Sequence, residues 1–176
     1  TQEVAQLLRR IAGLALAMEG EADVVARLIG ELQAAQASLA AIAPEDMAPR
    51  VGPDAPAGKR VYLDHSRDIG AYNPCFPEYI IEVEGSRARG TVTFPLAFEG
   101  PPGIVHGGVL ATFLDCVIQH HNCDVGVAGK TTSLLMEYHR PTPLFELLSF
   151  EIDRQVDDTR IISRARLLRA EKPEKV

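Results

Sequence analysis

A ten-residue stretch from residue 109 to residue 118 is apolar at eight positions, and its two exceptions are Thr112 and Asp115. Apolar residues surround the helical axis here, which favours a helix buried on all sides within a domain, and the stretch is too short to cross a bilayer. Small or polar residues recur at intervals of four, three and four and therefore share one helical face: Gly108, Thr112, Asp115 and Gln119. The pattern predicts one long buried helix, from about residue 107 to residue 121, with a narrow polar seam.

Apolar residues also recur at helical spacing near the N-terminus, first over residues 4–18 and, after Gly20, over residues 21–40. The second run begins with acidic residues, which helix N-termini prefer. We expect a helical hairpin extension over residues 1–43 that serves packing or oligomerisation. A DNA-reading helix-turn-helix is the disfavoured alternative, because Arg27 is the only basic residue of the second helix.

Residues 44–78 show no regular period and are expected to form a linker or wrapping loop. Four prolines and two glycines fall between residues 44 and 59. The later part, residues 65–77, fits either a surface loop or one wall of a ligand pocket. On the pocket interpretation, Asn73 is a candidate substrate-binding residue.

The hydropathy pattern changes to alternation after residue 78, which predicts β-strands. Two strands separated by Gly85-Ser86 form a hairpin, and three more follow the buried helix, the last two joined at Asp157-Asp158. The expected strands are Tyr79–Glu84, Arg89–Phe94, Thr131–His139, Leu147–Val156 and Arg160–Leu168. Long strands around one buried helix favour an α+β domain over residues 79–176, with a curved antiparallel sheet wrapped around the helix.

Charge and composition narrow the class of partner. The net charge of −6 argues against a nucleic acid, and no segment reads as a membrane span or a secretory signal. The three cysteines lack metal-binding spacing, so we expect reduced thiols in a cytoplasmic protein. His120, His121 and Cys123 are close in sequence but have no fourth ligand at the spacing of a tetrahedral site. We therefore expect neither a metal nor a resident cofactor.

Candidate chemistry is concentrated at the start and along the seam of the expected helix. His106-Gly107-Gly108 places backbone amides at a helix N-terminus, where they can face a ligand without an intervening side chain. Asp115 sits in an apolar helix, a costly place for a carboxylate unless it is paired or has a task. The alternative for Asp115 is structural, as a hydrogen-bond partner of a neighbouring strand.

These residues, in this order, carry a resemblance to a known family. The run EGPPGIVHGG over residues 99–108 is followed by Asp115, nine residues after His106, then by Thr131 and the run YHRP over residues 138–141. This arrangement resembles the hotdog-fold acyl-CoA thioesterases, and most closely their phenylacetate-pathway (PaaI-like) branch. The resemblance covers about residues 79–168 and implies a hotdog fold, with the N-terminal hairpin outside it.

The resemblance also implies roles for individual residues, in a site between the two subunits of a homodimer or tetramer. The amide of Gly107 or Gly108 would polarise the thioester carbonyl. Asp115 would act as general base or as nucleophile. Thr131, on a strand from the partner subunit, would place the water. His106 would orient the loop or contact the acyl carbonyl region.

The implied substrate is an acyl-CoA thioester, hydrolysed to a free acid and CoA. Thr112, on the seam, is a further candidate substrate contact, and His139 and Arg140 are candidates for the CoA phosphates. Gly100 departs from the family, some members of which have a polar side chain six residues before the histidine. The alternatives are a non-catalytic acyl-CoA binding or sensing protein and, less favoured, a hotdog hydratase.

Overall fold

The computed structural model describes residues 2–20, 23–43, 67–126, 129–157 and 160–169. The loop expected over residues 44–59 lies outside these ranges, as does Asp158 of the expected Asp157-Asp158 turn.

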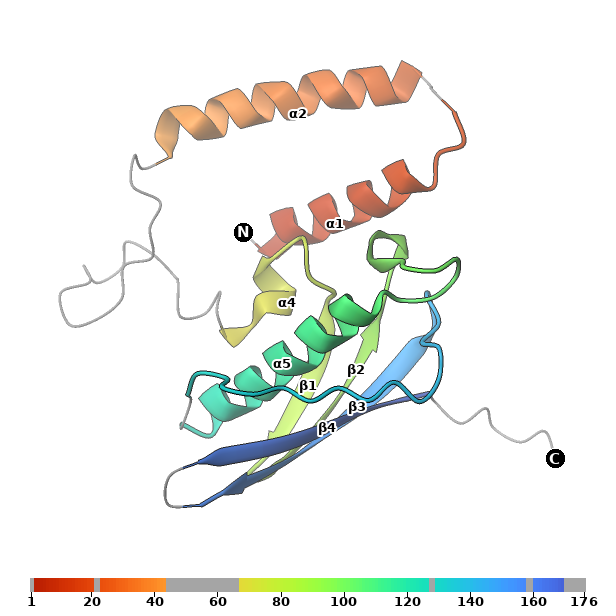
Figure 1. Ribbon diagram of the computed structural model, residues 1–176. Coiled ribbons are helices and arrows are strands. Elements are labelled where there is room, and N and C mark those ends of the chain that lie inside the picture. Colours follow the sequence, from red (N-terminus) through yellow and green to blue (C-terminus); the bar gives the residue numbers. More distant parts are fainter. Residues whose placement is uncertain (1, 21–22, 44–66, 127–128, 158–159, 170–176) are drawn as a thin grey trace.

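A four-stranded antiparallel sheet forms the base of the molecule (Figure 1). Its strands lie side by side in the order β1-β2-β3-β4, and the chain crosses from β2 to β3 through a long helix. Gly85 begins the two-residue turn between β1 and β2 with a φ of +60°, a conformation that glycine adopts readily. The strand bounds are β1 Tyr79–Glu84, β2 Arg87–Thr93, β3 Leu147–Val156 and β4 Ile161–Arg169. Four of the five expected strands are thus confirmed to within two residues at each end.

The long helix, α5 (Gly107–Asp124), lies across one face of this sheet, as the sequence predicts, and ends three residues later than expected. Phe113 is fully buried at its centre. The Phe113 ring centroid lies 5.3 to 6.0 Å from four other aromatic rings, those of Phe76, Tyr79, Phe94 and Phe150. The expectation that this helix is buried on all sides is wrong for one face. On that face, Gly108 and Thr112 of the seam are exposed, and Asp115 and Gln119 are half-buried. The polar seam is therefore open to a ligand.

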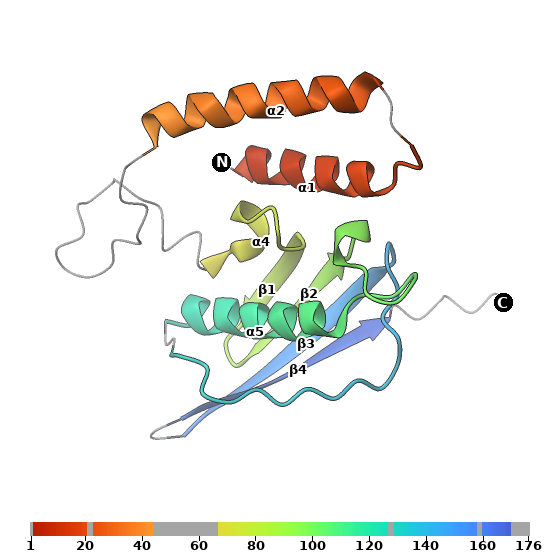
Figure 2. The same cartoon turned by 45° about the horizontal axis from the view of Figure 1, so that its top comes forward.

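The N-terminal segment forms the two expected helices, α1 (Gln2–Leu16) and α2 (Asp23–Ile42). Two short elements that the sequence did not reveal lie beneath α1: the helix α4 (Ile69–Tyr72) and the 3-10 helix η1 (Leu96–Phe98). In Figures 1 and 2, α4 lies between α1 and α5. Elements of three or four residues are too short to show a helical period, which explains why they were missed.

A buried arginine joins α1 to the domain. Arg9, only 7% exposed, donates to the carbonyl oxygens of Phe76 and Gly70 at 2.7 Å and of Asn73 at 3.0 Å. The Phe76 ring then stacks against Phe113 of α5. Helix α1 is thus connected to the core through the segment over residues 70–76.

The second helix lies outermost (Figure 2) and contains no buried residue. Its exposed large apolar side chains are those of Val24, Ile29, Leu32, Leu39 and Ile42. No helix among the described residues combines the length and the hydropathy that crossing a membrane requires.

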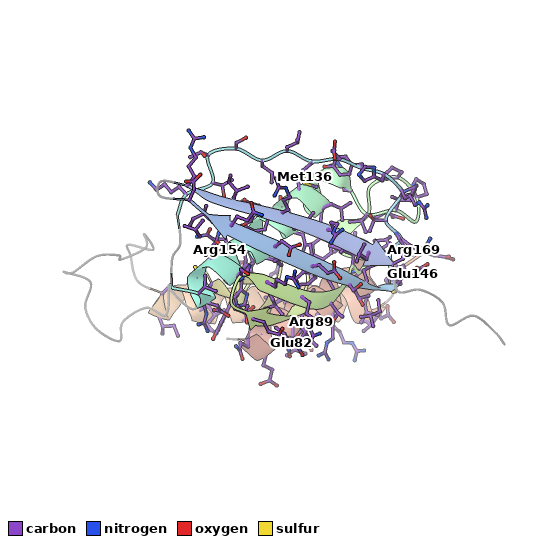
Figure 3. The ribbon with its side chains drawn as sticks, turned by 90° about the horizontal axis from the view of Figure 1, so that it is seen from below. Glu82, Arg89, Met136, Glu146, Arg154 and Arg169 are labelled. Atoms are coloured by element: carbon purple, nitrogen blue, oxygen red, sulfur yellow. The ribbon has the colours of Figure 1, made fainter. Side chains whose placement is uncertain are left out.

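The strand expected over Thr131–His139 does not form in the single chain, so this prediction is wrong for the chain on its own. Residues 131–139 are not part of any strand, and apart from the half-buried Met136 they are exposed. The segment runs along α5 on the side of β4, as Met136 shows in Figure 3. An alternating pattern signals side chains suited to a pleated surface, but a strand also needs a neighbour with free backbone groups. Residues 131–139 pair with no described strand, although β4 is the edge strand on that side of the sheet.

Charges alternate from strand to strand on the outer face of the sheet (Figure 3). Arg89 Nε lies 2.9 Å from Glu82, Arg87 Nε 3.4 Å from Asp153, and Arg166 3.2 Å from Glu151. The four columns are Glu82 and Glu84 on β1, Arg87 and Arg89 on β2, Glu151 and Asp153 on β3, and Arg164 and Arg166 on β4. Each acidic strand therefore has basic neighbours only.

Candidate active site

A tight loop over residues 99–106 leads into α5. The Gly103 amide donates to Glu99 Oε1 at 2.7 Å, and the His106 amide donates to the Phe98 carbonyl at 2.9 Å. A Cβ placed on Gly100 would come within 2.8 Å of the His106 Cα. The close approach of these two backbones explains the glycine, where some relatives of the resembled family have a polar side chain.

His106 caps the N-terminus of α5. Its Nδ1 accepts a hydrogen bond from the Gly108 amide at 3.0 Å. Its carbonyl oxygen accepts from the amides of Val109 at 2.9 Å and Leu110 at 3.2 Å. The amide of Gly107 donates to no described residue. Of the two amides expected to face a substrate carbonyl, the one that remains available is therefore that of Gly107.

The surroundings of the Gly107 amide also make it a strong hydrogen-bond donor. It belongs to the same peptide group as the His106 carbonyl, which already accepts two hydrogen bonds. Hydrogen bonds to a carbonyl polarise the whole peptide group, and the N-terminus of a helix adds a partial positive charge. An oxygen that gains negative charge near this amide would be stabilised.

Asp115 lies two turns further along the seam, beside Thr131. The Thr131 hydroxyl donates to Asp115 Oδ1 at 2.8 Å, and Oδ2 makes no hydrogen bond to a described residue. This contact lies within one chain, and the expected contribution of Thr131 to a site of the partner subunit stays a prediction. The hydroxyl holds the carboxylate and leaves one oxygen free to accept a proton.

The neighbouring thiol, Cys116, is a poor nucleophile. Burial, together with the adjacent Asp115 charge, raises the pKa of Cys116 to about 11. A protonated thiol has little reactivity toward a thioester. Among the described residues, no group of three His, Cys, Asp or Glu side chains is arranged to hold a metal ion.

Tyr138 approaches the first turn of α5 from the exposed segment. Its hydroxyl donates to the Gly107 carbonyl at 2.9 Å, and its ring lies 3.4 Å from the point where a Gly107 Cβ would stand. The sequence marked Tyr138 as part of a motif but gave it no role, because nothing in the local pattern shows that residue 138 returns to residue 107.

The other predicted site residues are placed less centrally. The Thr112 hydroxyl is exposed on the seam and donates to the Gly108 carbonyl at 2.9 Å. His139 and Arg140 are exposed, with His139 Nε2 4.0 Å from Glu137. Asn73 is engaged elsewhere: its side chain accepts from the Cys75 amide at 2.9 Å. The structure shows no contact between Asn73 and the seam.

The two chemical groups of α5 are far apart within one chain. Eight residues separate Gly107 from Asp115, which on a helix amounts to about 12 Å at 1.5 Å per residue. A ligand that meets the Gly107 amide would therefore lie about two helical turns from the backbone of Asp115. We call these two places the Gly107 half-site and the Asp115 half-site.

Acidification is expected to weaken the fold through His120, near the far end of α5. Its Nδ1 lies 2.7 Å from the Tyr79 hydroxyl and its Nε2 3.7 Å from Asp124 Oδ2. Burial lowers the pKa of His120 from its usual 6.5, and this effect exceeds the opposing one of Asp124. As the pH falls through about 6.5, the unfolded chain takes up the proton first, so stability present above that pH is lost below it. The melting temperature should drop more between about pH 7.5 and 5.5 for the wild type than for His120→Gln, which keeps an acceptor but does not titrate; equal drops would contradict this.

Among solved structures, one is similar over nearly the whole chain. No protein-family model matches it. The crystal structure of a thioesterase superfamily protein is similar at 29% identity and a TM-score of 0.78, covering 97% of this chain and 83% of the other. Thioesterase superfamily member 2 of Mus musculus has 13% identity and a TM-score of 0.49, covering 53% and 71%. A hypothetical thioesterase of Streptococcus pneumoniae, crystallised with coenzyme A, has 21% identity and a TM-score of 0.44, covering 51% and 76%. The first of these carries the fold assignment.

Proposed function

We propose that this chain, which has the hotdog fold of the thioesterase superfamily, hydrolyses an acyl-CoA thioester to a free carboxylic acid and CoA. The observation that carries the proposal is the Gly107 amide at the start of α5, which has no partner among the described residues and lies on the same helix as a carboxylate held by Thr131. An oxyanion donor and a positioned base are the two groups that acyl transfer to water requires. Membership of the PaaI-like branch stays a prediction.

The proposed mechanism assigns a separate task to each group. Asp115 Oδ2 takes a proton from water as the water oxygen attacks the thioester carbon, and Thr131 holds the carboxylate through Oδ1. The carbonyl oxygen becomes an oxyanion and accepts a hydrogen bond from the Gly107 amide. The C–S bond then breaks, CoA leaves as a thiolate, and the proton held by Asp115 restores its thiol and regenerates the carboxylate. Loss of one such oxyanion donor typically lowers the rate by about 100- to 1000-fold. Direct attack by Asp115, through an anhydride, is the alternative route.

We further propose that the working form is a homodimer, alone or within a tetramer. The separation of about 12 Å along α5 supports this, because Gly107 of one copy can approach Asp115 of another more closely than its own. Apart from Met136, the segment that carries Thr131 and Tyr138 is also exposed, with Leu135 84% and Leu134 45% exposed. A second copy would cover such side chains.

The proposed substrate class follows from chemistry around the seam. CoA carries phosphates, which need cationic partners. His139 and Arg140 are exposed beside Tyr138; Arg140 has no ion pair among the described residues and His139 has only the 4.0 Å contact with Glu137, so we assign both to the phosphates. Thr112 lies between the two half-sites and would contact the acyl group or the thioester. The reaction as proposed uses no metal, and we place the protein in the cytoplasm.

The test is to incubate the protein with a panel of acyl-CoAs and follow free CoA with a thiol reagent. We expect CoA release that scales with protein concentration, after subtraction of a blank without acyl-CoA that records protein thiols such as the exposed Cys75. Tight binding of acyl-CoA without release would contradict hydrolysis and favour an acyl-CoA sensor. Hydration of an enoyl-CoA without CoA release would favour a hydratase.

A further inference from the structure

We infer that Tyr138 is a positioning residue for the reaction, which sets the direction of the Gly107 amide from outside the helix; this inference rests on the proposed function. The hydroxyl of Tyr138 donates to the Gly107 carbonyl at 2.9 Å. That carbonyl lies one peptide group beyond the amide that would stabilise the oxyanion. Tyr138 itself would touch neither the thioester nor the water.

Two adjacent glycines explain why such a residue is needed. Glycine has the largest backbone freedom of any residue, so Gly107 and Gly108 tend to sample several amide directions. An oxyanion donor acts well only when its direction is held before the reaction begins. The glycines leave the helix start open to a ligand but contribute no rigidity of their own.

Hydrogen bonds restrain the two peptide groups on either side of Gly107. Of their N–H and C=O groups, only the Gly107 N–H has no partner among the described residues. In the first group, the His106 carbonyl accepts from the amides of Val109 and Leu110, and the Gly107 amide stays unpartnered. In the second, the Gly107 carbonyl accepts from Tyr138 and the Gly108 amide donates to His106 Nδ1. Because the second group is held at both ends, rotation about the Gly107 backbone is restricted and the free amide keeps one direction.

The placement of the ring supports the same role. It lies 3.4 Å from the position of a Gly107 Cβ, so it also restricts movement of Gly107 toward the exposed segment. Tyr138 and Thr131 are the two residues of this segment whose side chains donate hydrogen bonds to α5 among the described residues. One holds the Asp115 half-site and the other the Gly107 half-site. Movement of this segment would therefore affect both half-sites.

The test uses Tyr138→Phe, which keeps the ring and removes only the hydroxyl. We expect kcat to fall about tenfold, the loss of roughly one hydrogen bond's worth of transition-state stabilisation, while KM and the melting temperature stay close to wild type. Ser133→Ala removes an exposed hydroxyl from the same segment and should leave kcat unchanged. A purely structural role would instead lower stability and leave kcat per folded molecule intact.

A second background asks whether Tyr138 acts through Gly107. Gly107→Pro removes that amide proton at the first helical position, where proline is well tolerated. Tyr138→Phe should cost nothing further in Gly107→Pro, and a full additional tenfold loss would overturn the inference. So would an unchanged kcat in Tyr138→Phe made in the active wild type.

The inference can be tested apart from the proposed function. In amide NMR spectra, the signals of Gly107 and Gly108 should shift in Tyr138→Phe and stay in place in Ser133→Ala. If the wild type hydrolyses no acyl-CoA but these signals shift, the proposed function fails while the positioning contact stands. Unmoved signals would remove Tyr138 from this role whatever the activity.

Discussion

Asp115→Asn is expected to lower turnover by at least about 100-fold, the lower range for loss of a positioned acid–base group. The amide keeps the size of the side chain and can still accept the Thr131 hydrogen bond, so the fold should survive. It cannot take a proton from water. KM should change little, because the Gly107 amide still meets the thioester carbonyl. Turnover and melting temperature should be measured on the same preparation. A stable Asp115→Asn protein with near wild-type turnover would remove Asp115 from the mechanism and favour the acyl-CoA sensor.

The same variant tests whether each site is shared between two chains. Gly107→Pro and Asp115→Asn should each be almost inactive, but a mixed dimer of the two contains one site with both an intact amide and an intact carboxylate. Unfolding and refolding an equal mixture should restore about a quarter of wild-type activity, because half of the dimers are mixed and each has one of two sites. No recovery from a mixture that does form mixed dimers would place both groups of a site in one chain.

Arg9→Met is expected to lower the free energy of unfolding by about 3 kcal/mol, because it removes the arginine donor from the buried carbonyls of Phe76 and Gly70 and one of two donors from the carbonyl of Asn73. For a chain of this length, that loss corresponds to a fall in melting temperature of roughly 6–12 °C. The methionine retains the length of the apolar stem, so the effect isolates the guanidinium. Chemical denaturation followed by circular dichroism measures it.

Arg10→Met is the matched control, since Arg10 is exposed on the same helix. It should change the free energy of unfolding by less than about 0.5 kcal/mol. Similar losses in the two variants would mean that the Arg9 contacts with the loop over residues 70–76 do not hold α1 to the domain.

The elements that could be predicted are those whose side chains repeat with a clear period. Helix α5 combines an apolar run with a seam at intervals of three and four, and β1 and β3 alternate across a sheet with one buried face. These patterns reflect burial that each residue experiences in its own element. They also located the helix start and Asp115 as the places for chemistry.

Contacts between distant residues could not be predicted in this way. In the sequence, Arg9 has the pattern of an ordinary surface charge, because its three acceptors lie more than 60 residues away. Tyr138 belongs to a visible motif, but its partner Gly107 lies 31 residues earlier. The expected strand over residues 131–139 failed for a related reason, since alternation gives the shape of a segment and not the identity of its neighbour.

Which of the two amides stays available, that of Gly107 or that of Gly108, could not be predicted from the sequence either. The two residues are identical in chemistry and adjacent in sequence. Which amide stays available depends on the rotamer of His106, whose Nδ1 turns back to accept from Gly108. A ring that faced away would have left both amides open.

The columns of charge on the outer face of the sheet bear on which strands can become neighbours while the chain folds. A chain that laid β1 against β3, or β2 against β4, would set like charges opposite one another, which destabilises a strand pair. The inner faces of the strands do not distinguish the correct strand order from these two, because buried apolar side chains of different strands can substitute for one another in a loose core. Each exposed pair contributes less than about 1 kcal/mol, but the wrong order replaces several attractive pairs by repulsive ones together. The solvent-facing side of the sheet thus disfavours two misfolded topologies, and concentrated salt, which screens exposed charges, would weaken that selection.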